Sequence, residues 1–291
     1  MKRGILTLAA AATMTINPLF ACGQDGHDGF LPENDMWIGT NVKSAGGITE
    51  SVFNEVLDRV EDIYAPIISA RGKKMVVERN WSDGTVNAYA RQTGNNWQIS
   101  MFGGLARHEA ITADGFALVA CHETGHHLGG EPKKKSWWST SWASNEGQSD
   151  YFGALKCLRK YVELDDNVSM MANVNVPAEV TTQCQTNFAN VEDVAICQRV
   201  AMAGLSTATL LGNIGRESNI PSFDTPDSTV VSSTNHNHPK AQCRLDTYYA
   251  ASLCDKHHDE DIVEGDFNAA QCARVDGYDI QARPKCWYKA K

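Results

Sequence analysis

Two histidines four residues apart flank an acid in the run His122-Glu123-Thr124-Gly125-His126. On an α-helix, residues at this spacing differ by about 40° around the axis and about 6 Å along it, so both imidazoles can reach one metal ion. The run is an H-E-x-x-H motif, in which the glutamate lies beside a metal-bound water molecule and can take its proton. We therefore expect one catalytic Zn²⁺ ion, with His122 and His126 as ligands and Glu123 as the general base.

A catalytic zinc ion usually has three protein ligands, and the third does not lie next to this motif. In the extended motif H-E-x-x-H-x-x-G-x-x-H the third ligand would fall at Pro132, whose side chain has no metal-binding atom. Further along, Glu146 and Asp150 are again four residues apart on a predicted helix. We expect Glu146 to be the third ligand and Asp150 to accept a hydrogen bond from a ligand histidine. His127 lies about 100° from His126 around the helix and is expected to be a packed or solvated neighbour.

Capping residues and apolar spacing predict the helices that must hold these residues. Thr112 is a typical helix N-cap, Asp114 suits the positive end of the helix dipole, and the glycines at 129–130 would end this helix. A second helix, over about residues 145–162, would carry Glu146 and Asp150. Two more helices are expected, from Glu50 to about Tyr64 after a Thr49 cap and from about Val191 to Leu211.

Three strands are expected before the motif, over residues 74–79, 86–91 and 97–102, with a turn at 93–96. Residues 131–144 and 213–237 are expected to be loops. A small early β-sheet with an active-site helix, followed by a mostly helical part, indicates the α+β class.

These motifs resemble those of a known group of zinc peptidases. An E-x-x-x-D helix after H-E-x-x-H is the gluzincin pattern, and the interval from His126 to Glu146 is similar to that of thermolysin. The surroundings resemble the HtpX and CaaX-prenyl-endopeptidase family in four segments along residues 50–250: N-A-Y-A at 87–90, the strand and glycine at 97–104, D-x-x-A-x-V-x-x-H-E at 114–123, and H-P-x-x-x-x-R at 238–244. The chain departs from that family in its shorter segment before Glu146, its lack of membrane helices and its cysteine-rich C-terminal part.

The resemblance implies a zincin-like fold and zinc-dependent hydrolysis of a protein or peptide substrate. The strand implied to bind the substrate backbone by β-augmentation comprises Asn87, Ala88 and Tyr89. The residues implied to stabilise the oxyanion are Arg244 and His238, with His236 as an alternative to His238. A structural role in anchoring a loop is an equal alternative for His238 and Arg244.

Other interpretations of the same residues stay open. The chain can be a zinc-binding chaperone-like or binding lipoprotein without turnover, or a hydrolase of cell-wall peptides. The intact Glu123 argues against the first alternative, because turnover needs a base. The tryptophans at 137, 138 and 142 either pack or line a substrate cleft, and residues 256–261 form a solvated turn or a second metal site.

The N-terminus is typical of a bacterial export signal. Lys2 and Arg3 precede an apolar run of about 12 residues, which is too short to span a bilayer. Leu19-Phe20-Ala21-Cys22 resembles a lipobox, in which the cysteine is acylated; ordinary cleavage near Ala21 is the alternative. We therefore expect a signal peptide at 1–22, a tether at 23–35 and a metallopeptidase domain at 36–291, whose core covers about 47–250 and whose cysteine-rich extension covers about 251–291.

Composition narrows the partners and the compartment. The 291 residues carry a net charge of −9, which disfavours binding to nucleic acid and to anionic lipid surfaces. Contact with a membrane is therefore expected only through a lipid on Cys22. With Cys22 set aside, eight of the nine cysteines remain, an even number that suits four disulfides in an exported, periplasmic or secreted protein. These eight are Cys121, Cys157, Cys184, Cys197, Cys243, Cys254, Cys272 and Cys286. Their pairing and the oligomeric state are left open.

Overall fold

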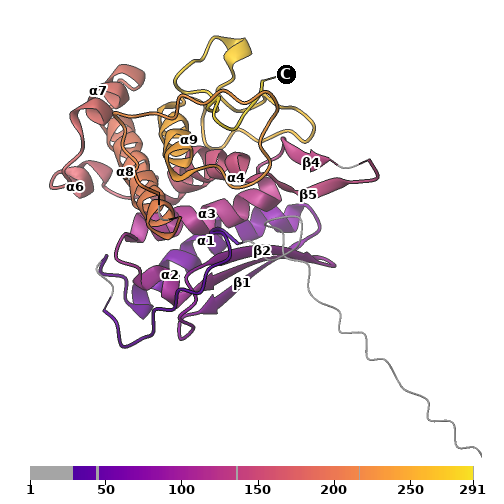
Figure 1. Cartoon of the computed structure of the whole chain (residues 1–291), viewed down its shortest axis with the longest axis vertical. Coiled ribbons are helices and arrows are strands. Elements are labelled where there is room, and N and C mark those ends of the chain that lie inside the picture. Colours follow the sequence, from indigo (N-terminus) through magenta and orange to yellow (C-terminus); the bar gives the residue numbers. More distant parts are fainter. Residues whose placement is uncertain (1–28, 44–45, 136, 216, 291) are drawn as a thin grey trace, which may run out of the picture.

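A computed structural model describes residues 29–43, 46–135, 137–215 and 217–290. Its helices and small sheets confirm the α+β class. Helix α3 (Ala113–Leu128) crosses the middle of the molecule, with a sheet and helix α1 on one side and most later helices on the other (Figure 1). We call these the sheet side and the helical side. The predicted signal peptide at 1–22, including Cys22, lies outside the described residues.

The sheet side begins with α1 (Glu50–Ala70), one of the predicted helices. The Thr49 side chain accepts a hydrogen bond from the Val52 N–H, as an N-cap does. The helix continues for six residues beyond Tyr64, where the sequence predicted its end. Its apolar face is buried against the sheet and against α3.

The three predicted strands are confirmed as β1 (Lys74–Asn80), β2 (Ala88–Thr93) and β3 (Asn96–Phe102). They form a sheet in the order β1-β3-β2, with β1 parallel to β3 and β2 antiparallel to it. Strand β2 therefore lies at an edge of the sheet and faces the region of α3. A short helix that the sequence did not predict, α2 (Gly103–Arg107), follows β3.

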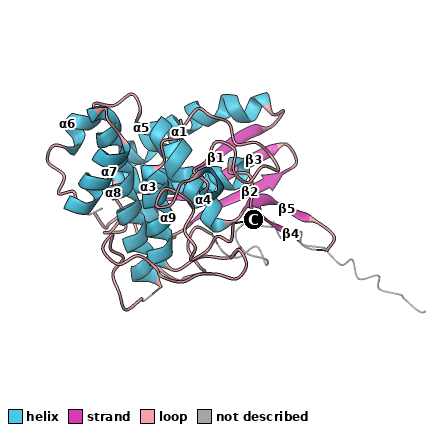
Figure 2. Cartoon of the chain, turned by 90° about the horizontal axis from the view of Figure 1, so that it is seen from above, coloured by secondary structure: helices cyan, strands magenta, loops and turns pink. Residues whose placement is uncertain are grey.

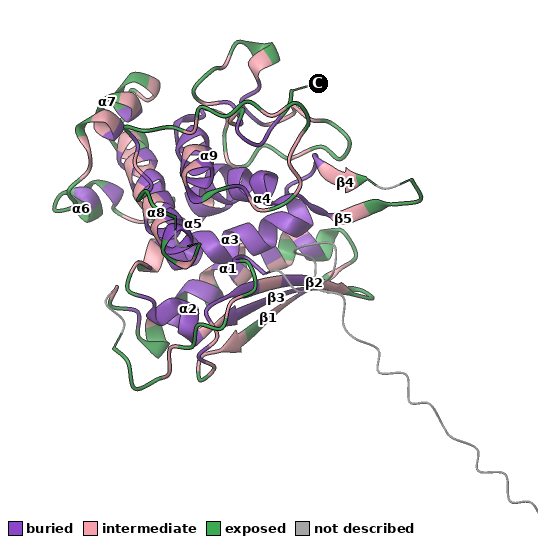
Figure 3. Cartoon of the chain, viewed as in Figure 1, coloured by how far each residue is buried: buried purple, intermediate pink, exposed green. Residues whose placement is uncertain are grey.

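Helix α3 carries the H-E-x-x-H motif and is buried on nearly every face (Figure 3). It begins at Thr112, whose side chain accepts a hydrogen bond from the Gly115 N–H, and Gly129 caps its C-terminus, as predicted. Because the sheet side packs below it and the helical side above it, α3 has no solvent face on which charged residues would be expected.

On the helical side, the predicted 145–162 helix is confirmed as a continuous run. It consists of α4 (Glu146–Phe152), a π-helical stretch η1 (Gly153–Leu158) and α5 (Arg159–Val162). The predicted long helix is α8 (Val191–Ile214). The chain also forms helices that the sequence did not delimit: α6 (Asn167–Met171), α7 (Ala178–Asn187), α9 (Ala241–Leu253) and the 3₁₀ turn η2 (Arg274–Asp276).

The expectation of a loop throughout residues 131–144 is wrong. Strands β4 (Lys133–Lys135) and β5 (Thr140–Ser144) pair antiparallel there, at the opposite end of the molecule from α6, α7 and α8 (Figure 2). The sequence did not indicate the first strand because it consists of three lysines, and charged residues are depleted from strands in general. They are tolerated in an exposed pair of strands such as this one.

All eight cysteines expected to form disulfides do so. Cys121–Cys157 joins α3 to η1, and Cys184–Cys197 joins α7 to α8. Cys243–Cys286 and Cys254–Cys272 tie the C-terminal segment to α9 and to itself. The C-terminal part from residue 251 is thus held to the helical side by covalent bonds.

Helix α8 is the one helix of the described residues that is long and apolar enough to cross a membrane by length and composition. Of its most apolar window, 67% is buried inside the protein. The helix therefore packs within the protein.

Of the predicted tether at 23–35, the structure describes residues 29–35. Gly29, Phe30 and Leu31 are buried, and the Phe30 N–H donates a hydrogen bond to the Ala88 carbonyl (2.9 Å). These three residues are therefore part of the packed protein and not a tether. Burial of the large apolar side chains of Phe30 and Leu31 lowers the free energy of the folded chain, and this favours packing over a solvated linker.

Candidate metal centre

His122, Glu123 and His126 of α3 meet Glu146 of α4 in a buried cluster. The metal-binding atoms of the three α3 residues lie within 4.8 Å of one another. Glu146 Oε2 is 3.3 Å from His122 Nε2, and Glu146 Oε1 is 3.7 Å from His126 Nε2. The structure thus brings together the three predicted ligands and the predicted base.

Local sequence determines how each helix presents its part of the cluster. The four-residue spacing puts both histidines on one face of α3. On α4, the Asn145 side chain caps the helix by accepting a hydrogen bond from the Gln148 N–H (3.0 Å), so Glu146 is the first helical residue. A carboxylate is favoured at this end of a helix by the helix dipole.

Each ligand histidine is oriented by a partner at its other ring nitrogen. His122 Nδ1 is 2.7 Å from Asp150 Oδ1, as expected for the predicted partner of a ligand histidine. His126 Nδ1 donates to the Ser144 carbonyl at 2.9 Å, and Ser149 Oγ lies 3.0 Å from the same nitrogen. With a proton on Nδ1 in both rings, both Nε2 atoms are left to face Glu146.

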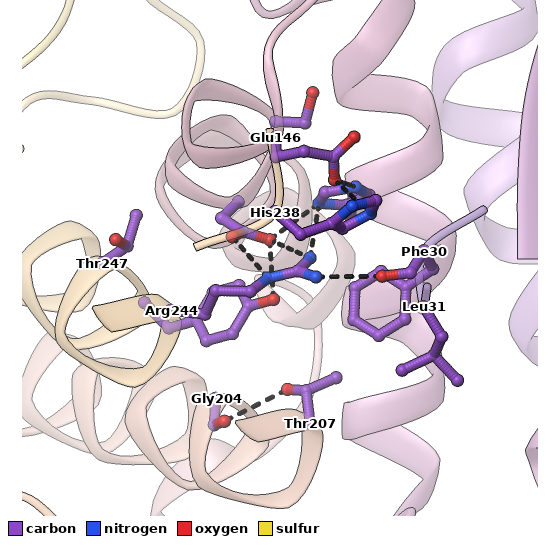
Figure 4. A network of polar contacts seen from close by, with 12 residues as sticks. Phe30, Leu31, Glu146, Gly204, Thr207, His238, Arg244 and Thr247 are labelled. Carbon is purple, nitrogen blue, oxygen red and sulfur yellow. Dashed lines mark hydrogen bonds and ion pairs between the residues drawn. The ribbon is translucent and has the colours of Figure 1, made fainter. Parts of the chain in front are cut away.

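Asp150 is in turn held by Arg244 and Tyr248 of α9. Arg244 donates to both carboxylate oxygens, through Nε at 2.8 Å and Nη2 at 2.7 Å, and the Tyr248 hydroxyl donates to Oδ1 at 2.6 Å. All three side chains are buried. Figure 4 shows Arg244 at the centre of this network, reaching from the histidines toward Phe30. The predicted H-P-x-x-x-x-R segment therefore supports the ligand histidine through Asp150.

Burial and neighbouring charges shift the pKa values of the acidic and basic side chains in the site. Burial raises the pKa of Glu123 to about 8 and lowers that of His126 to about 4. Burial also lowers the pKa of His122, but the Asp150 carboxylate raises it more, to about 9. Burial raises the pKa of Glu146, and the nearby His238 and His126 rings lower it more, to below its usual range. Metal binding would accordingly release the proton from His122.

The donor set and its unmet hydrogen-bonding capacity fit a zinc ion. His122 Nε2, Glu146 Oε2 and both carboxylate oxygens of Glu123 are buried and make no hydrogen bond of regular geometry. Groups of this kind are costly to bury without a partner, and they converge here. Two imidazoles and one carboxylate, with an acid beside them, are the ligands of a catalytic zinc site of the His₂Glu type.

His238 lies at the rim of the same cluster. Its Nε2 is 3.3 Å from Glu146 Oε2 and 2.9 Å from the Gly29 carbonyl oxygen. His236, the alternative, is instead near the Asn145 amide, with 3.4 Å between Asn145 Nδ2 and His236 Nδ1. Of the two predicted candidates, His238 is therefore the one that contacts Glu146, the predicted third ligand.

The three residues of the predicted substrate strand lie in two different environments. Asn87 and Ala88 are buried and bond to the segment at residues 29–31. Tyr89 packs edge-on against Phe102, with 5.8 Å between ring centroids. Sequence reasoning did not find residues 29–31 as part of the site, although Phe30-Leu31 is an apolar pair within a polar stretch and was a usable signal.

The remaining candidates lie away from the cluster or beside it. His127 is not among the grouped metal-binding residues; its ring stacks between Trp97 and Trp142, at 5.3 and 4.9 Å between centroids. Trp142 therefore packs, whereas Trp137 and Trp138 are 89% and 90% exposed and do not pack into the protein. In the 256–261 segment, His257, His258 and Asp259 group closely enough to hold a metal ion, mostly at the exposed surface.

Compared with models of protein families, with curated proteins and with solved structures, the chain matches none of them. The interpretation of the site consequently rests on its own geometry and chemistry.

Proposed function

We propose that the protein is a zinc-dependent endopeptidase of gluzincin type with a zincin-like fold. One observation carries the proposal: His122 and Glu146 meet at 3.3 Å, buried, beside the Glu123 carboxylate, neither oxygen of which has a hydrogen-bond partner in the part of the chain that the structure describes. A cluster that only stabilised the fold would satisfy these atoms within the protein. The intact H-E-x-x-H motif and the Asp150 partner of His122 support the same assignment.

The residues divide the chemistry among them. His122, His126 and Glu146 would hold the ion, and zinc bound there would supply an activated water molecule and an electrophile for the substrate carbonyl. Glu123 takes the proton of the water and passes it to the leaving amine. His238, whose Nε2 faces the site, donates a hydrogen bond to the oxyanion.

Export of the protein is part of the proposal. Four disulfides are typical of oxidising compartments, which supports the export signal in the sequence. We propose a lipid anchor on Cys22 at the periplasmic face of a bacterial membrane. Mass spectrometry of the protein purified from membranes should give an acylated N-terminal Cys22; an unmodified cysteine there would contradict the anchor.

Substitution of Glu123 by Gln tests the enzymatic function. Glu123→Gln keeps the shape of the side chain but removes the base, so hydrolysis of a peptide library should fall by a factor of at least about 1,000. Elemental analysis should still find one zinc ion per chain, because Glu123 is not a ligand. The control is Glu109→Gln, an exposed acid upstream of α3, which should keep full activity.

Three results would contradict the proposal or part of it. Absence of stoichiometric zinc in the wild-type protein would remove the metal centre. Zinc without hydrolysis in the wild type would favour a binding protein without turnover. Equal hydrolysis by Glu123→Gln and wild type would exclude Glu123 as the base.

A further inference from the structure

The segment Gly29–Leu31 pairs with the edge of the sheet beside the metal centre. The Phe30 N–H donates to the Ala88 carbonyl at 2.9 Å, and the Leu31 N–H donates to Asn87 Oδ1 at 3.0 Å. Asn87 Nδ2 donates in return to the Leu31 carbonyl at 3.0 Å. One backbone hydrogen bond and two bonds with the Asn87 side chain thus hold the segment, which bends at Phe30 and Leu31, against the start of β2, the strand expected to bind the substrate backbone.

The carbonyl groups of this segment point toward the site's polar side chains. The Gly29 carbonyl accepts a hydrogen bond from His238 Nε2 at 2.9 Å, and the same nitrogen is 3.3 Å from the ligand atom Glu146 Oε2. The next carbonyl, of Phe30, accepts from Arg244 Nη1 at 2.9 Å (Figure 4). The Gly29 carbonyl is thus the one that lies at the edge of the metal cluster.

The two residues joined by the Gly29–Phe30 bond fit closely into the space around them. The Phe30 ring is fully buried; it lies edge-on to His122 at 5.0 Å between centroids and under the Arg244 guanidinium at 4.3 Å. One wall of its pocket is therefore a metal ligand. At Gly29, a Cβ atom would lie 2.3 Å from the Ala88 oxygen, so only glycine fits.

We propose that Gly29–Leu31 occupies the substrate position of its own site and that the Gly29–Phe30 peptide bond is the one cleaved. This inference rests on the proposed endopeptidase function. The oxygen of a water molecule bonds to the Gly29 carbonyl carbon, and the C–N bond to Phe30 breaks. Glu123 transfers one water proton to the Phe30 nitrogen and the second water proton also goes to this amine, so the products are a Gly29 carboxylate and a new N-terminal ammonium group on Phe30. The same contacts define a preference for glycine before the cleaved bond and a large apolar residue after it.

Intact-mass analysis of the purified full chain tests the cleavage. With zinc present, the wild type should convert to a form that begins at Phe30, at a first-order rate independent of protein concentration. Glu123→Gln should stay uncleaved at this bond. Gly29→Val should also stay uncleaved, because its side chain would collide with Ala88, whereas the control Asp35→Asn, an exposed residue of the same segment, should be cleaved like the wild type.

Amide hydrogen exchange gives a second readout that needs neither zinc nor activity. In the metal-free Glu123→Gln protein, the Phe30 and Leu31 amides should be protected, because both donate hydrogen bonds to the edge strand. Adding Gly29→Val should abolish this protection and leave that of β3 unchanged. Unprotected Phe30 and Leu31 amides in the single variant would overturn the proposed docking.

The failure of this inference is distinguishable from that of the endopeptidase function. If the wild type hydrolyses library peptides while its own Gly29–Phe30 bond stays intact, the segment is a structural strap and the inference is overturned, although the peptidase function stands. If library cleavage also shows no preference for glycine before an aromatic or large aliphatic residue, the specificity is overturned as well. If no peptide is cleaved at all, the endopeptidase function itself fails.

Discussion

On the sheet side of α3, one strand-and-helix layer packs into the apolar core that continues through α3 to the helical side, and residues 23–120 contain no cysteine. On the helical side, helices alternate with long segments that have almost no regular structure, chiefly residues 218–240 and 254–290. Two of the four disulfides, Cys243–Cys286 and Cys254–Cys272, and buried arginines hold the second of those segments. Arg283, for example, donates to the Gln148 side chain at 2.9 Å and to the Glu131 carbonyl at 3.3 Å.

The two sides show two ways of providing hydrogen-bond partners for backbone N–H and C=O groups. On the sheet side, neighbouring strands pair N–H and C=O groups with each other. In the irregular C-terminal segment of the helical side, arginine side chains donate to carbonyl oxygens, as Arg274 does to Arg283 and Arg283 does to Phe267. Arg107 does the same for the loops of the sheet side. Arginine suits this role because it has five donors in a rigid plane and stays charged. The candidate metal centre lies where the two sides meet, with α3 and β2 on one side of it and α4 and α9 on the other.

Reduction of the disulfides should produce the largest difference in stability between the two sides. In the chain-entropy model each disulfide contributes about 3 to 4 kcal/mol, and four together are comparable to the total stability of a domain, about 5–15 kcal/mol. Under a thiol reductant, hydrogen exchange should accelerate first in α9 and the C-terminal segment and later in β1 and β3. Equal acceleration on both sides would show that they unfold as one unit.

The sheet side should respond most to loss of apolar volume. Phe53 is fully buried and contacts the rings of Phe116 and Trp81, at 5.1 and 5.4 Å between centroids. Phe53→Ala should lower the free energy of unfolding by about 4 kcal/mol, because it leaves a cavity in a packed core. Urea denaturation under oxidising conditions measures the change. Asp62→Ala, an exposed position on the same helix, should change stability by less than about 0.5 kcal/mol.

On the helical side, a single arginine should matter nearly as much as that core residue. Arg199 of α8 binds both oxygens of Asp114 at 2.7 and 2.8 Å, and its Nη1 binds Asp165 at 2.8 Å. Arg199→Met should cost about 3 kcal/mol, because it removes the ion-pair partner of Asp114 and leaves Asp165 with Arg59 alone in a partly buried site. The pair of Lys133 with Glu264, an acid that is 72% exposed, is the control, and Lys133→Met should cost less than about 1 kcal/mol.

The effect of Arg199→Met should depend on pH. Burial raises the pKa of Asp165, but hydrogen bonds from Arg199 and Arg59 lower it more, to below its usual value. A carboxyl group with a lowered pKa in the folded state stabilises the protein above its unfolded pKa, about 3.9, and loses this contribution as the pH falls through the folded value. The stability difference between wild type and Arg199→Met should therefore be largest near pH 7 and shrink below about pH 4. A constant difference would exclude this ion pair as the cause.

The smallest effect is expected at a helix cap on the sheet side. Thr49→Ala removes the acceptor for the Val52 N–H and should destabilise the protein by about 1 kcal/mol. Thr49→Ser keeps the acceptor and should be close to wild type in the same urea titration. Similar losses for both variants would mean that the methyl group of Thr49, and not the cap, provides the stability.

Elements with strong local signals were predictable from the sequence. The Thr49 and Thr112 caps and the alternating strands have short-range causes, and the structure has them where the sequence predicted. Helix α9 was not predicted, because its buried positions include Arg244 and Thr247 and so lack an apolar stripe. The pair β4–β5 was missed because its stabilising contacts are with the partner strand and not within the lysine run.

The sequence by itself determined the candidate ligands, since the spacing within α3 and within α4 is a property of helix geometry. The tertiary structure alone decided which cysteines pair, that His238 and not His236 lies against Glu146, and that Gly29–Leu31 enters the site. Those contacts join residues far apart in the chain, 209 positions between Gly29 and His238 and 214 between Phe30 and Arg244. Their free energy comes from packing surfaces that exist only once the two sides of α3 have folded together, so no local spacing encodes them.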